Sequence, residues 1–385
     1  MGLTTPASTW SGEDHDMFVD AVRRFYSREL VPNMERWTSG GIVDRDFWNK
    51  AGDAGLMGGS VPEEYGGSGG GLGFDSIVLY EQGACGDMSW GFGIQSIVIH
   101  YILKYGSHEQ KSKWLPPLVS GDMVGALAMS EPGCGSDVQS ITTTAFPDGN
   151  QYRLNGSKTF ITNGMTADLV IVAARTDRGS GARGISLVVV EAGSTDGFRR
   201  GRNLEKMGLH GNDTAELFFD NAAVPLTNLL GDEEGQGFYQ LMKQLPWERL
   251  LIAITALGTM DLAVTSTTGY VRQRKAFGQR IMDFQNTRFK LAEAKTKCEL
   301  LRSFVNDCIT RIEAEQLDPA TASMAKYWGS QAQNEVMNEC LQLHGGYGYM
   351  AEFQISRLYT DARVQMIYGG TNEIMKELIA RSLDD

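Results

Sequence analysis

The chain has 385 residues, of which 42% are hydrophobic and 21% charged, so two or three globular domains are expected. Its formal net charge of −12 argues against nucleic acid as a partner, because an acidic surface repels phosphate backbones. Five cysteines without a CxxC pair and five scattered histidines indicate neither a disulfide framework nor a metal site, and they favour reduced thiols in the cytoplasm. No apolar run of about 18 residues predicts a membrane span, and the first residues do not resemble a secretory signal.

The first region, about residues 11–120, has the apolar spacing of helices. Ser11 and Gly12 precede acidic residues, as at a helix start, and Phe18, Val22 and Phe25 then recur at helical spacing. Further helices are expected at 44–54, 76–84 and 94–105, with a glycine-rich loop at 62–73.

The second region, about residues 125–230, consists of short β-rich runs separated by Gly, Asn, Asp and Pro. The runs lie at 126–129, 152–154, 169–173, 185–190 and 215–219. Strands of this length and spacing are typical of a small barrel or sandwich.

The third region is helical again, with long apolar stretches at 245–268, 287–314 and 319–343 and a final helix at 371–382. Its apolar stripes predict a four-helix bundle with faces left over for other subunits. We therefore predict an α+β fold with three domains: an all-α domain at 1–124, a β-barrel at 125–232 and a helical bundle at 233–385.

The first motif, residues 129–137, leaves a strand and enters a glycine-rich turn. Pro132 and the glycines give a tight backbone with free N–H groups, which suit a pyrophosphate or a flat heteroaromatic edge, although an ordinary barrel loop has the same pattern. This stretch resembles the Ser-Glu-Pro-x-x-Gly-Ser-Asp signature of the acyl-CoA dehydrogenase family. The resemblance implies FAD as the cofactor, flavin contacts from Leu127, Met129 and Ser130, and contact of Ser136 with the acyl thioester.

The second motif covers residues 154–164. Asn155 and Gly156 are a hairpin turn signal between strands. By resemblance to the family, Phe160, Ile161 and Thr162 are expected to contact the flavin. A place for Phe160 in the barrel core is the alternative.

The third motif, residues 272–280, is basic within an acidic protein. A solvated basic face is the usual reading of such a run, but guanidinium groups also bind phosphate in a bidentate manner. The resemblance implies that Arg274 reaches the flavin pyrophosphate of a neighbouring subunit, with Phe277 and Gln285 also at the cofactor.

Two glycine-rich segments close the chain. In 342–349 the resemblance implies that Gln342, Gly345 and Gly346 contact the adenine-dinucleotide half of FAD, while His344 is read as structural rather than as a base. In 367–374 it implies cofactor contacts for Thr371 and Glu373, although a Gly–Thr pair also caps a helix. Many family members carry their catalytic glutamate at the position of Gly369.

A catalytic base is therefore expected elsewhere. The reaction removes the proton α to a thioester while a β-hydrogen leaves as hydride, and an apolar pocket raises the pKa of a carboxylate toward that task. Glu248 follows Trp247 and opens an apolar stretch; the alternative is a helix N-terminal glutamate favoured by the helix dipole, with Pro246 in the first turn. The segment resembles the long-chain branch of the family, which places its base here, and Gly369 is expected to donate a backbone N–H to the carbonyl.

The resemblance implies an acyl-CoA substrate, trans-2-enoyl product, an electron-transfer flavoprotein as acceptor and a homotetramer built as a dimer of dimers. The substrate-binding residues that it implies, with Arg249 facing the nucleotide of coenzyme A, are Ser136, Ala182, Arg183, Tyr239, Arg249, Gly369 and Gly370. The same chemistry on an acyl carrier protein, a flavin oxidase or monooxygenase, and a non-catalytic flavin-binding protein are the alternatives.

Overall fold

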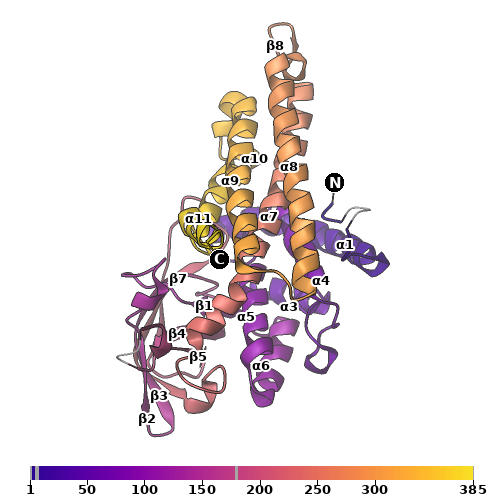
Figure 1. The fold of residues 1–385 in the computed structure, drawn as a ribbon. Helices are drawn as coiled ribbons and strands as arrows, with labels where there is room; N and C mark the ends of the chain where they lie inside the picture. The colour runs from indigo at the N-terminus through magenta and orange to yellow at the C-terminus, as the bar shows by residue number, and fades with distance from the viewer. Residues whose placement is uncertain (1, 5–7, 178–180, 385) are drawn as a thin grey trace.

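The protein is described by a computed structural model over residues 2–4, 8–177 and 181–384, in which helices, strands and helices follow one another along the chain (Figure 1). The N-cap of helix α1 is Gly12 rather than Ser11, and the His15 ring accepts the Gly12 N–H. The N-terminal helices are α1 (Glu13–Phe25), α2 (Met34–Gly40), α3 (Arg45–Asp53), α4 (Leu72–Cys85), α5 (Phe92–Tyr105) and α6 (His108–Ser120).

Helices α4 and α5 are apolar on nearly all sides, so they lie inside the molecule rather than on its surface. Helix α6 begins at a capping box between Ser107 and Gln110. The periodicity did not predict α6, because Pro116 and Pro117 interrupt its pattern near the C-terminal end.

The middle region forms one seven-stranded sheet in the order β1-β4-β2-β3-β7-β6, with β5 paired to β4. Two of the predicted runs are β4 and β5, which pair antiparallel and are buried along almost their whole length. Two strands, β2 and β6, were not predicted. The strands are β1 (Gly125–Ala128), β2 (Thr144–Asp148), β3 (Gln151–Thr162), β4 (Leu169–Arg175), β5 (Ile185–Glu191), β6 (Phe198–Asn203) and β7 (Thr214–Pro225).

The predicted hairpin turn at Asn155 and Gly156 is wrong. Both residues lie inside β3, where a β-bulge shifts the register against β7 and Gly156 takes a φ of 148°. The tight connection is instead between β2 and β3, at Gly149, which has a φ of 64°. An Asn-Gly pair supplies positive φ, which a bulge uses as well as a turn does.

The C-terminal region is built around α7, which packs against α4, α5, α8 and α9 (Figure 1). By length and composition α7 could cross a membrane, but 72% of its most apolar window is buried inside the fold, as in the core helix of a globular protein. The elements are α7 (Gly237–Gln273), α8 (Gln285–Glu313), α9 (Pro319–His344), α10 (Gln354–Ala362) and α11 (Asn372–Arg381), with a hairpin of β8 (Lys275–Ala276) and β9 (Gln279–Arg280) after α7.

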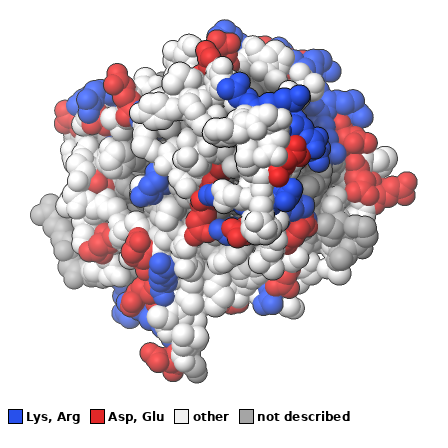
Figure 2. Space-filling view, turned by 90° about the horizontal axis from the view of Figure 1, so that it is seen from above, with Lys and Arg blue, Asp and Glu red and all other residues white. Residues whose placement is uncertain are grey.

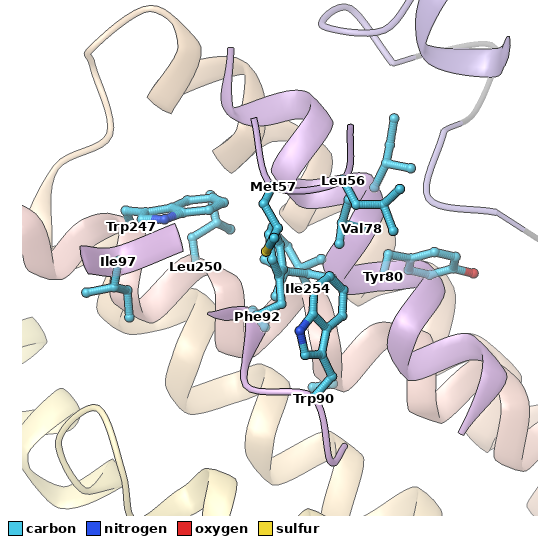
Figure 3. Close-up of a cluster of buried hydrophobic side chains, with 14 of the residues drawn as sticks. Leu56, Met57, Val78, Tyr80, Trp90, Phe92, Ile97, Trp247, Leu250 and Ile254 are labelled. Atoms are coloured by element: carbon cyan, nitrogen blue, oxygen red, sulfur yellow. The ribbon is translucent and has the colours of Figure 1, made fainter. Parts of the chain in front are cut away.

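Side chains of α7 meet those of α4 and α5 in a shared apolar core (Figure 3). The consequence for the site is that the middle of α7 is enclosed by helices on several sides and has little access to water. The residues drawn there include Val78 and Tyr80 of α4, Phe92 and Ile97 of α5, and Trp247, Leu250 and Ile254 of α7.

Candidate active site

Glu248 lies in the interior of α7, about three turns after the helix begins at Gly237. The interpretation as a helix N-terminal glutamate is therefore wrong, as is the placement of Pro246 in the first turn. Pro246 is also inside the helix, where it cannot donate to the carbonyl of Met242. The helix tolerates this proline because burial of its apolar faces stabilises it.

The Glu248 side chain is 5% exposed and sits in the same helical turn as Trp247 and Leu250 of the core. The Tyr101 hydroxyl donates a 2.7 Å hydrogen bond to Oε1 of Glu248. Burial raises the pKa of Glu248 to about 7, although the Tyr101 hydrogen bond and the charge of Arg249 both act to lower it. Such a carboxylate is partly ionised at neutral pH and can accept a proton.

The turn at Gly369 and Gly370 lies against the same stretch of α7. Both residues have positive φ, 63° and 89°. A Cβ atom at Gly369 would come within 2.6 Å of Cδ1 of Ile252, which is one turn after Glu248 on the same helix face. The structure therefore brings Gly369 near Glu248, and a side chain at Gly369 would have to displace the end of the Ile252 side chain.

Lys326 of α9 holds this turn from the other side. Its buried Nζ donates to the carbonyl of Gly370 at 2.7 Å and to Oδ1 of Asn372 at 2.9 Å. Burial and, to a smaller extent, the nearby charge of Arg249 together lower the pKa of Lys326 to about 8. The turn is thus fixed by a buried cation rather than by its own flexible glycines.

Arg249 is 4% exposed, and its Nη1 donates to Oγ of Ser323 at 3.1 Å. Its contact with a coenzyme A nucleotide stays a prediction. Thr371 is the N-cap of α11 and accepts from the N–H of Ile374, and Glu373 lies exposed in the first turn, so the helix-cap interpretation of this pair holds alongside the expected cofactor contact.

A buried ion pair shapes the first motif. Lys158 of β3 donates to Oε1 of Glu131 and to the carbonyl of Met129, both at 2.9 Å. The N–H of Thr159 donates to the carbonyl of Ser130 at 3.0 Å. The predicted flavin contacts at Met129 and Ser130 are in this way joined to the strand that carries Phe160 and Thr162, and Leu127 precedes them in β1.

Phe160 is 70% exposed and has a φ of 60°, which a bulky side chain seldom adopts. Its placement in the barrel core is therefore wrong. The next residue, Ile161, is buried in that core instead. An exposed aromatic ring held at a strained backbone position is a feature of ligand sites.

A cleft of about 620 Å³ lies at the ends of α7 and α9 and brings together Arg274, Gln342, Gly345 and Gly346. The Arg274 guanidinium lies 5.5 Å from the ring of Tyr347. Viewed from the end of the molecule that carries the β8–β9 hairpin, Lys and Arg side chains gather on one side (Figure 2). An open guanidinium beside two glycines fits the phosphate-bearing half of FAD.

Three other residues lie at this end of the molecule, and the cofactor contacts expected for Phe277 and Gln285 stay predictions. His344 is buried, stacks on Tyr270 at 4.3 Å and bonds to the carbonyl of Cys340 through Nδ1, as expected for a structural histidine. Phe277 is 95% exposed with a φ of 51°, and Gln285 is exposed at the start of α8.

The predicted substrate contacts lie at surfaces. Ala182 and Arg183 form a short 3₁₀ turn, and the carbonyl of Arg183 approaches Gly235 just before α7. Tyr239 follows in the first turn of α7 and is 44% exposed. Ser136 is exposed in the first motif. Their contacts with a thioester stay predictions.

The sequence did not single out Tyr101 or Lys326. A tyrosine in the apolar stretch of α5 and a lysine in the small-residue stretch of α9 were the available signals, since polar groups in buried helices need partners. Their partners are 147 and 44 to 46 positions away, so only the fold identifies them.

Comparison with known proteins covers the chain from end to end. Family models for the N-terminal, middle and C-terminal domains of acyl-CoA dehydrogenase match residues 12–122, 126–222 and 235–383. A mitochondrial long-chain specific acyl-CoA dehydrogenase of Sus scrofa is 50% identical over 96% of this chain and 86% of its own length.

Solved structures agree with this. The crystal structure of an acyl-CoA dehydrogenase from Geobacillus kaustophilus has 47% identity and a TM-score of 0.96, and the match covers 98% of this chain and all of that one. The prolyl acyl carrier protein oxidase AnaB has 31% identity and a TM-score of 0.90, covering 97% and 99%. The predicted fold, helical domain, curled sheet and helical domain, is confirmed.

Proposed function

Because this chain belongs to the acyl-CoA dehydrogenase family, we propose that Glu248 is its catalytic base. The protein is an FAD-dependent oxidoreductase that dehydrogenates acyl-CoA. One observation supports the assignment to Glu248 above others. A buried carboxylate with a pKa of about 7 lies beside the turn at Gly369, a residue that carries no carboxylate of its own.

Glu248 takes the proton from the α-carbon of the thioester, and the electrons of that C–H bond form the new double bond as the β-hydrogen leaves as hydride. FAD, when bound, accepts this hydride. The backbone N–H of Gly369 donates to the thioester carbonyl and stabilises the enolate-like charge. The apolar wall around Glu248 excludes water from the step.

Most of the expected cofactor-binding residues form two groups, one at the sheet and one near the β8–β9 hairpin, which Figure 1 shows in different parts of the molecule. One group surrounds Phe160 and the first motif near the sheet, and the other lines the cleft at Arg274 beside the β8–β9 hairpin. We propose that two subunits complete each FAD site, within a homotetramer. The exposure of Phe277 and Tyr349, 95% and 83%, supports a subunit contact at the hairpin end.

Substrate recognition follows from the same proposal. The thioester and its handle, the coenzyme A part of the substrate, are bound by Ser136, Ala182, Arg183, Tyr239 and Arg249. Gly370 lies beside the thioester carbonyl. The proposed domain boundaries follow residues 124 and 232.

We further propose that an electron-transfer flavoprotein takes the electrons. A cytoplasmic location is proposed because all five cysteines carry free thiols.

The likeness to AnaB supports a second candidate, oxidation of an acyl group on a carrier protein with oxygen as acceptor. The two candidates differ in handle and in acceptor. Anaerobic bleaching of the flavin by acyl-CoA, with little peroxide under air, supports the first. Bleaching only by the carrier-bound thioester, with rapid peroxide formation, supports the second.

Glu248→Gln tests the base. The variant should fold, retain yellow flavin and fail to bleach with any acyl thioester, because an amide cannot accept the proton. Glu35→Gln, an exposed glutamate on α2, serves as the control and should bleach as the parent does. Normal bleaching in Glu248→Gln would remove Glu248 from the reaction.

A further inference from the structure

We propose that Tyr101 is the positioning residue of the base, holding Glu248 through Oε1 and leaving Oε2 to take the proton. This inference rests on the proposed role of Glu248 and extends it. Among the described residues, Tyr101 makes the only hydrogen bond to the Glu248 side chain. Because the bond to Oε1 restrains rotation of the planar carboxylate, the free oxygen Oε2 has a defined direction.

The geometry makes this contact rigid. Tyr101 belongs to α5 and is fully buried, and its ring packs 6.1 Å from that of Tyr105. Its hydroxyl oxygen lies 2.7 Å from Oε1, the length of a strong bond to a charged acceptor. Helix α5 packs directly on α7, so the bond ties the base to a neighbouring helix.

Tyr101 donates at every pH at which the enzyme can work. Burial raises the pKa of its hydroxyl well above the ordinary value, and the negative charge of Glu248 adds to this effect. The phenol therefore neither ionises nor takes the substrate proton. Its role is to stabilise the charged form of Glu248 where water cannot.

Other ionisable groups on the packed helices are already engaged or more remote. Tyr105 of α5 bonds to the carbonyl of Gln240 at 3.3 Å. Arg249 of α7 acts on Glu248 through its charge, and the same charge lowers the pKa of Lys326 of α9. On α4, Asp75 accepts from Ser96 at 2.5 Å and lies 3.6 Å from Nε2 of His100.

Loss of the Tyr101 hydroxyl should raise the pKa of Glu248. Burial favours the protonated carboxyl, and the Tyr101 hydrogen bond opposes it. Without the hydroxyl the Glu248 pKa rises, so the base is protonated over a wider acidic range. Bonds to charged groups of this kind correspond to a pKa change of about one unit or more.

The test is Tyr101→Phe in the FAD-loaded enzyme. The probe is whichever acyl-CoA of a straight and branched panel bleaches the parent fastest, and the rate of anaerobic flavin reduction is followed from pH 5.5 to 9. The acidic limb of the plot of reduction rate against pH should move to higher pH by about one unit. The reduction rate should fall roughly tenfold below the midpoint of the limb and less at pH 9, while the Kd for the thioester stays unchanged.

Tyr105→Phe is the matched control and should leave the limb in place. A second readout needs no turnover. The C=O stretch of protonated Glu248, identified by subtracting the spectrum of Glu248→Gln, should titrate at higher pH in Tyr101→Phe than in the parent. The role of Tyr101 would be overturned if both the acidic limb of the rate profile and the titration of the Glu248 C=O stretch stay in place, or move to lower pH, in Tyr101→Phe.

The two proposals fail differently. Bleaching by Glu248→Gln removes the base and the inference with it. An inactive Glu248→Gln together with an unshifted Tyr101→Phe leaves the base in place and removes only the inference.

Discussion

The buried pair between Lys158 and Glu131 supports the loop that carries the first motif, and its loss can be given a magnitude. Lys158 is fully buried, and Glu131 also accepts from the N–H and hydroxyl of Thr142 and from the N–H of Thr143. Removing one partner of such a pair costs about 3–5 kcal/mol, because the other charge remains buried. Since Glu131 keeps its three other hydrogen-bond donors, Lys158→Met should lower the free energy of unfolding by about 3 kcal/mol.

A double-mutant cycle separates the ion pair from simple packing. Lys158→Met with Glu131→Gln leaves no buried charge, so the double variant should be more stable than the sum of the two single losses predicts, by about 1–3 kcal/mol. The exposed pair Arg153–Asp148 on the same hairpin is the control, and Arg153→Met should cost less than about 1 kcal/mol.

Denaturant unfolding of the FAD-loaded enzyme, followed by circular dichroism and by release of flavin fluorescence, measures both effects. Burial works against ionisation of Glu131, but Lys158 and the hydrogen bonds outweigh it and lower its pKa to about 2. This stabilisation is present above the unfolded pKa of about 4.5 and is lost as the pH falls toward 2. Additive losses, or equal acid sensitivity in parent and Lys158→Met, would refute the reasoning.

Four further outcomes are expected. Phe160→Ala should weaken FAD retention while leaving unfolding of the apoprotein within about 0.5 kcal/mol, because the ring is exposed; equilibrium dialysis measures the first. Arg274→Leu should reduce FAD affinity at least tenfold, as judged by flavin content after dilution, if two subunits share the phosphate site. Gly369→Ala should lower the bleaching rate and the thermal midpoint together, since φ is 63° and Ile252 is 2.6 Å from the added carbon. Burial raises the pKa of Asp361 to about 6, so the contribution of this carboxyl group to stability falls as the pH rises from about 4 to 6. Asp361→Asn should therefore be more stable than the parent at pH 7 but not at pH 4, as measured by thermal unfolding at the two pH values.

The sequence allowed the order of the regions, the long C-terminal helices and the apolar surroundings of Glu248 to be predicted, because apolar periodicity and motif resemblance are local signals. The start of α7 could not be predicted in this way. Pro246 is a strong local start signal, but eight helical residues before 245 are stabilised by packing rather than by propensity. The bulge at Asn155 and Gly156 was predicted to be a hairpin turn, because a positive φ at glycine occurs in both β-bulges and tight turns. The bond from Tyr101 to Glu248 joins residues 147 positions apart and exists only after α5 packs on α7.

Helix α7 carries Tyr239 in its first turn, Glu248 about three turns from its start and Arg274 at its C-cap. At ~1.5 Å per residue its 37 residues form a rod about 55 Å long. One inserted residue between two of these positions would turn the later one by about 100° around the axis and advance it by about 1.5 Å. Loops elsewhere in the chain can change length without this effect. The spacing along α7 is therefore the dimension that an insertion, a deletion or a chimaeric junction must preserve for thioester, base and nucleotide to stay aligned.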